Sequence, residues 1–196
     1  MELKEIAFGL SGLFSKLVAV TELLGRSALL SNAAFLDEAD TILPDARRLT
    51  ENLSRELSKS AANEPPAMKY ASVPGHAERI CDHFENFSGL LRAKAAENIH
   101  FSDKAMGEMN YMIGRLKDML SNASGMLLAG DAFTAEYMRQ AELSVLKSAC
   151  DFAALHDERL REGICLPKAS SLYLSMLEGM KAAAWHLKEM TRDLLE

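Results

Sequence analysis

The apolar residues near the start of the chain recur at alternating steps of four and three positions, and this spacing constrains the fold more than any other feature. Such a step places every apolar side chain on one face of an α-helix, which must then pack against another helix. The chain shows no sustained alternation typical of strands and is rich in good helix formers. We therefore predict an all-α protein. The residues in this first stripe are Ile6, Leu10, Leu13, Leu17, Val20 and Leu24, and those of a matching stripe near the end are Met176, Met180, Ala183, Leu187, Met190 and Leu194.

Turn-forming residues divide the chain into six helical segments. The short connections between them indicate that successive helices pack antiparallel. We expect Ser102 to cap the fourth helix, with Phe101 and Met106 forming a hydrophobic staple. Pro74 should either kink the third helix or lie at its start, because a proline inside a helix removes a hydrogen bond. The breaks are Ser31-Asn32, residues 63–66, residues 98–102, Gly130-Asp131 (a C-cap glycine and an N-cap acid) and residues 163–168.

Six helices raise the question of an internal repeat. A shift of 103 positions superimposes His83 on His186, and a shift of 97 superimposes Asp45 on Glu142. The sequence thus predicts two tandem antiparallel three-helix bundles with up-and-down topology, covering residues 1–99 and 100–196 and forming one compact domain.

Charge and hydropathy exclude several classes of partner. The net charge of −6 argues against binding nucleic acid or an anionic bilayer, since both attract cationic surfaces. The apolar stretch from Ile6 to Val20 carries Lys16 and precedes Glu22, so we expect an amphipathic helix that is too short and too charged for direct membrane insertion. Three cysteines without a CxxC pair indicate free thiols in a reducing cytoplasm.

One short stretch carries a candidate site. Glu78 and Asp82 are four residues apart and so share a helix face, which Asn86 continues. Two carboxylates one turn apart can share a metal cation. The alternative is a solvated acidic face whose carboxylates pair with nearby arginines and lysines. His83 and its counterpart His186 are interpreted as packing or hydrogen-bonding histidines.

Two longer stretches resemble a known family. ERICDHFEN (78–86) followed by IHFSDKAMGEM (99–109) is similar to the end of the third and the start of the fourth helix in PhoU-family proteins. HDERLREGICLPKASSLYLSMLEGM (156–180) is similar to the junction between the fifth and sixth helices of the PhoU-like domain of sodium/phosphate cotransporters.

The resemblance implies tandem three-helix bundles, a cytoplasmic location near the inner face of the membrane, and control of phosphate uptake through a phosphate transporter or a sensor kinase. It also implies iron or zinc clusters held by ExxxD motifs. Glu78 and Asp82 match that motif in full, and Asp45 would be a third ligand. The family's second acid is replaced by Leu49, Leu146 and Trp185 in the other copies, which leaves Glu142 alone in the second half.

Two further expectations concern activity and assembly. The only ExxH motif is Glu97 to His100, and there is no phosphate-binding glycine loop or GxSxG motif, so we do not expect an enzyme. The methionine-rich fourth helix and the apolar first helix suggest a homodimer through exposed apolar faces. Trp185 is expected either to fill its bundle or to anchor a partner.

Overall fold

The computed structural model describes residues 3–61, 65–129 and 132–193, and within them it contains six α-helices, one 3₁₀ segment and no strand. The all-α prediction and the number of helices are therefore confirmed. The elements are α1 (Leu3–Leu30), α2 (Ala34–Ala61), η1 (Pro65–Tyr70), α3 (Val73–Ala96), α4 (Asp103–Ala129), α5 (Ala132–Arg161) and α6 (Pro167–Asp193).

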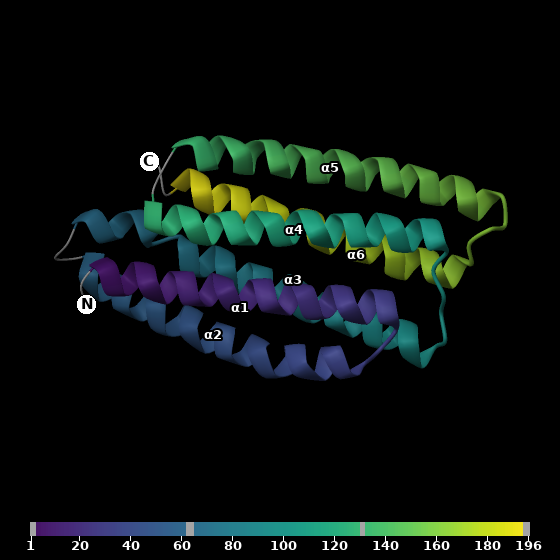
Figure 1. Ribbon diagram of the computed structural model, residues 1–196, viewed down its shortest axis with the longest axis horizontal. Coiled ribbons are helices and arrows are strands. Elements are labelled where there is room, and N and C mark those ends of the chain that lie inside the picture. Colours follow the sequence, from purple (N-terminus) through teal and green to yellow (C-terminus); the bar gives the residue numbers. More distant parts are fainter. Residues whose placement is uncertain (1–2, 62–64, 130–131, 194–196) are drawn as a thin grey trace.

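The six helices run alternately in opposite directions along one elongated bundle (Figure 1). α1, α3, α4 and α6 form its centre, while α2 and α5 lie at opposite edges. The connections 31–33, 97–102 and 162–166 all lie at one end. The expected boundary at residues 99 and 100 falls in the second of these connections.

Local sequence explains where the helices begin and end. Asn98 (φ 50°) and Gly163 (φ 73°) adopt the left-handed conformation just after α3 and α5. In both places the amide of the following residue closes a Schellman-type bond, from Ile99 N–H to the Lys94 carbonyl and from Ile164 N–H to the Arg159 carbonyl, each 2.9 Å. The same helix ending thus occurs in both halves of the chain.

The helix starts agree with the sequence where the structure describes them. The Ser102 hydroxyl accepts a hydrogen bond from the Ala105 N–H at 3.3 Å, as expected of an N-cap. Pro74 lies in the first turn of α3, where no intrahelical hydrogen bond is lost, so the third helix starts there rather than kinking. The expected caps at Gly130 and Asp131 lie outside the described residues.

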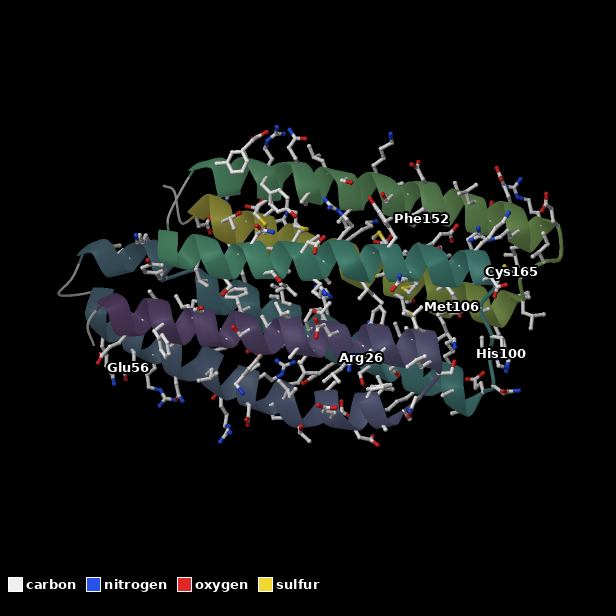
Figure 2. All side chains as sticks on the ribbon, viewed as in Figure 1. Arg26, Glu56, His100, Met106, Phe152 and Cys165 are labelled. Carbon is white, nitrogen blue, oxygen red and sulfur yellow. The ribbon has the colours of Figure 1, made fainter. Side chains whose placement is uncertain are left out.

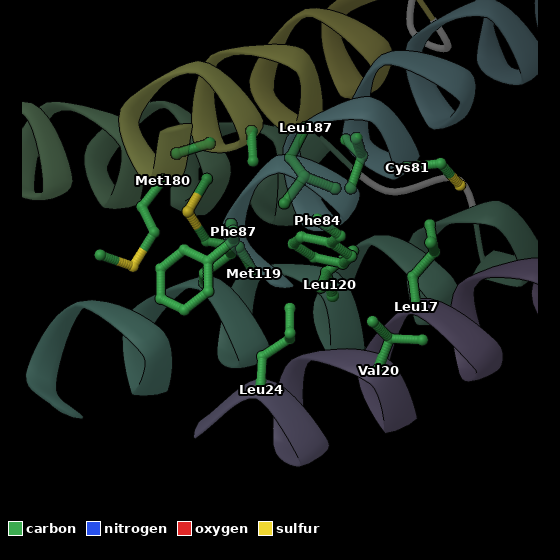
Figure 3. Close-up of a cluster of buried hydrophobic side chains, with 14 of the residues drawn as sticks. Leu17, Val20, Leu24, Cys81, Phe84, Phe87, Met119, Leu120, Met180 and Leu187 are labelled. Atoms are coloured by element: carbon green, nitrogen blue, oxygen red, sulfur yellow. The ribbon is translucent and has the colours of Figure 1, made fainter. Parts of the chain in front are cut away.

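One hydrophobic core runs through both halves. Figure 3 shows side chains from α1, α3, α4 and α6 in a single cluster, including Leu17, Phe84, Leu120 and Leu187. The apolar stripe of α1 is fully buried, and α1 packs most extensively on α4 of the other half. The two bundles therefore share one continuous buried apolar surface.

The same packing bears on the expected homodimer. The apolar face of α1 and the methionine-rich face of α4 cover each other, and Met109, Met112 and Met119 are buried. A homodimer remains a prediction, and it would have to use other surfaces.

The first apolar stretch is part of a longer apolar helix than the segment from Ile6 to Val20, so its length by itself does not exclude a membrane span. Among the described residues, Glu5–Leu30 is one helix that is long and apolar enough by length and composition, with mean hydropathy 1.5. Lys16 and Glu22 lie within it. In this structure its stripe is covered by α2, α3 and α4, as in a core helix.

Candidate functional site

The acidic face of α3 carries three carboxylates, and a guanidinium from α2 lies among them. Arg47 donates to Asp82 at 2.9 Å through Nη2, to Glu85 at 2.9 Å through Nε, and to Glu78 through Nη1. Glu78, Asp82 and Glu85 are spaced by four and three, so they share one face of α3. Hydrogen bonds to Glu85 and Asp82, and the charge of Glu78, raise the pKa of Arg47 above its ordinary value.

The other residues of the expected site are not brought to this cluster. Asp45 pairs instead with Lys16 at 3.9 Å and with Arg48. It lies two residues from Arg47 on α2, on a different side of that helix. Asn86 is exposed beyond the cluster, and Glu142 is half-buried on α5, which packs on α4 and α6.

These residues do not fit a metal centre in the arrangement observed. A metal would need several oxygen or nitrogen ligands converging on one point. Arg47 already pairs with both carboxylates of the ExxxD motif, and the third expected ligand, Asp45, pairs elsewhere. Among the residues described, no group of three or more His, Cys, Asp or Glu side chains is arranged to hold a metal ion.

Elemental analysis tests this reading. We expect protein purified without chelator to contain iron and zinc well below one ion per chain, because metal binding would have to displace Arg47. The matched variants are Glu78→Ala/Asp82→Ala, which removes the motif, and Arg47→Ala, which frees its carboxylates. Stoichiometric metal in the wild type that disappears in Glu78→Ala/Asp82→Ala would contradict the expectation and restore the metal site.

Next to the acidic face, α3 and α6 bring three histidines and a tryptophan together. His76 Nδ1 lies 3.1 Å from His186 Nδ1, and the His83 and His186 ring centroids are 5.8 Å apart. His76 Nε2 lies 3.5 Å from a carboxylate oxygen of Asp193. The Trp185 ring meets His186 edge-on at 4.9 Å and remains 44% exposed, so it does not fill the core of its bundle.

Burial lowers the pKa of two histidines in this cluster, His83 and His186. Desolvation, together with the charges of His76, His83 and Arg79, lowers the pKa of His186 to about 4, while Asp82 opposes the change. Burial also lowers the pKa of His83. Protonation of His186 is therefore unfavourable in the folded protein.

Acidification should destabilise the fold through this cluster. His186 has an ordinary pKa of 6.5 and a folded pKa of about 4, so the unfolded chain takes up the proton first. Its contribution to stability is complete above pH 6.5 and is lost as the pH falls toward 4. From pH 7.5 to 5.5 we expect the free energy of unfolding to fall by about 1 kcal/mol. Urea titrations at both pH values measure this loss. An equal loss in the His186→Gln variant would show that His186 is not its cause.

The second half holds a more deeply buried ion pair. Arg159 on α5 makes a bidentate contact with Glu108 on α4, at 2.8 and 2.7 Å, and Tyr173 on α6 donates to the same carboxylate. The Arg159 and Glu108 side chains are 9% and 11% exposed. Burial, followed by the hydrogen bond to Glu108, raises the pKa of Tyr173. The cluster links all three helices of the second bundle.

Sequence reasoning did not assign Arg47, Glu85 or the Glu108–Arg159 pair. The spacing of Glu78, Asp82 and Glu85 could have indicated the third acid. It places Glu85 on the same helix face as the other two, next to Asn86. No local pattern relates Arg47 to these acids, since it lies 31 positions before Glu78. Glu108 and Arg159 are similarly 51 positions apart.

The fold and these clusters define an all-α protein of two tandem three-helix bundles with a shared core. One solved structure that it resembles is the crystal structure of PhoU from Pseudomonas aeruginosa, with a TM-score of 0.87 and 12% sequence identity over 98% of this chain and 95% of that chain. The chain therefore has a PhoU-like fold. The sequence matches no protein-family model and no curated protein.

Proposed function

We propose that this protein is a non-enzymatic regulator of phosphate uptake that acts through contacts with a phosphate transporter or its sensor kinase. The observation that carries the proposal is the likeness to PhoU along almost the whole of both chains. Two segments of the sequence, residues 78–109 and 156–180, resemble helices of PhoU-family proteins. This resemblance also supports the proposal. The acidic character of the chain fits a protein partner better than nucleic acid.

The partner surface that we propose lies along the seam of α3 and α6. Trp185 offers a half-exposed aromatic ring there, and His83 packs beside it through His186. Asn86 lies one turn beyond His83 on α3 and is exposed. An exposed aromatic next to polar groups is typical of residues that contribute most to a protein interface. The neighbouring Arg47 cluster would contribute to specificity through its charges.

Assembly and location follow from the same proposal. A cytoplasmic protein at the inner face of the membrane would meet the exposed loops of a transporter or kinase. A homodimer would use surfaces other than the faces of α1 and α4 that cover each other in the fold.

Phosphate uptake in the source cell tests the proposal. Deletion of the gene should change the uptake rate of radiolabelled phosphate in phosphate-replete medium, and the wild-type gene should restore it. Trp185→Ala should restore it poorly, because the variant lacks the proposed anchor, while Phe8→Ala, which changes an exposed aromatic on α1, should restore it fully. Unchanged uptake after deletion would overturn the proposal.

A further inference from the structure

A buried lysine without a counter-charge lies at the end of the first bundle. Lys94, in the last turn of α3, is only 6% exposed. Its ammonium group lies 5.3 Å from the centre of the Phe101 ring. Among the residues that the structure describes, no carboxylate pairs with it and no hydrogen-bond acceptor receives its protons. Burial lowers the pKa of Lys94 as a result.

This isolation sets Lys94 apart from three arginines of the fold, one each on α2, α3 and α5. Arg47, Arg92 and Arg159 each contact at least one carboxylate. A buried cation is costly unless it is paired and hydrogen-bonded. The Phe101 ring gives a cation–π contact, and the carbonyl end of α3 favours positive charge, but neither replaces the three hydrogen bonds that an ammonium group can donate.

Lys94 lines a cavity that can hold the missing partner. The cavity has a volume of about 150 Å³, at least ten times the roughly 10–15 Å³ that a single water molecule needs. Figure 2 shows His100 at the end of the bundle where the helix connections lie. Besides Lys94, the polar residues lining the cavity are Ser27, Ser31, Asn98 and His100, and no described Asp or Glu lines it.

The chemistry of this lining selects the ligand. Serine hydroxyls and an asparagine amide can donate hydrogen bonds, and lysine adds a positive charge. The N-terminus of α2, with Leu36 in its first turn and Ala33 just before it, also borders the cavity and contributes the positive end of a helix dipole. A metal cation would be repelled by Lys94, and an apolar ligand would leave its ammonium unpaired.

We propose that this cavity binds a small oxyanion, of the size of phosphate, sulfate or acetate, with Lys94 as the charge partner and Ser27 among the hydrogen-bond donors. The oxyanion supplies the negative charge and the hydrogen-bond acceptors that Lys94 lacks among the described residues. The site does not rest on the regulatory function proposed above, and either can fail without the other.

Isothermal titration calorimetry of the full chain tests the site. Sodium phosphate, sulfate and acetate are titrated separately at constant ionic strength into the wild type, Lys94→Met, Ser27→Ala and Lys104→Met. Lys104 is exposed in the first turn of α4 and does not line the cavity, so its variant loses the same charge at the same end of the molecule. Circular dichroism establishes that each variant is folded.

We expect saturable binding to the wild type, abolished in Lys94→Met, weakened about 3- to 10-fold in Ser27→Ala through the loss of one hydrogen bond, and unchanged in Lys104→Met. Binding of phosphate and sulfate without acetate would identify a tetrahedral oxyanion, and binding of acetate a carboxylate. No binding of any of the three would overturn the proposal, as would wild-type affinity in Lys94→Met. If Lys94→Met does not fold, unchanged affinity in Ser27→Ala overturns it.

Discussion

Glu108→Ala should lower the free energy of unfolding by about 3–5 kcal/mol, because it leaves the Arg159 guanidinium buried without its carboxylate. The two groups meet in a bidentate contact at 2.8 and 2.7 Å, and both side chains are nearly covered. Tyr173 would lose its hydrogen-bond acceptor as well. A loss of this size is a large part of the roughly 5–15 kcal/mol that stabilises a typical domain. Urea denaturation followed by circular dichroism measures it.

Two further variants separate the charge effect from general damage. Glu136→Ala removes an exposed carboxylate on α5 that pairs with Arg139, and it should leave the stability unchanged within error. Glu108→Leu/Arg159→Leu removes both charges and should be less destabilised than Glu108→Ala alone. An effect of Glu108→Ala no larger than that of Glu136→Ala would show that the buried pair is not important for the fold.

Phe84→Ala should cost about 3–5 kcal/mol and unfold both halves of the chain in one transition. Phe84 is 3% exposed and lies on α3, in the first half. It belongs to the same cluster as Leu120 on α4 and Leu187 on α6, in the second half (Figure 3). The cavity left by its ring therefore weakens the packing between the two bundles.

The chain offers its own probes and control for this experiment. Trp185 is the only tryptophan, so its fluorescence reports on α6, while far-ultraviolet circular dichroism reports on all the helices. Coincident transitions by both probes indicate one cooperative unit. Phe8→Ala alters a phenylalanine that is 79% exposed and should cost little. Separate transitions for the two probes would mean that the bundles unfold independently.

The candidate site was predicted in part. That Glu78 and Asp82 share a face follows from their spacing, and both do lie on one side of α3. Their partner was not predictable from the same reasoning, because the cation that reaches them comes from α2. The family motif predicts that Asp45 lies with these acids. Arg47, two residues further along α2, makes the contacts with them instead. Residues two positions apart on a helix point to nearly opposite sides, so only one of them can face a given neighbouring helix.

The sequence by itself determined the helices, most of the described boundaries and the amphipathic faces. These are local properties, since a helical period, a cap or a left-handed Asn98 depends on residues within a few positions of each other. Only the tertiary structure decided which faces meet. The apolar stripe of α1 could have covered a second molecule, and instead it packs on α4. The Arg47 cluster, the Glu108–Arg159 pair and the isolated Lys94 arise in the same way, because each depends on groups that the chain brings together, or keeps apart, across tens of residues.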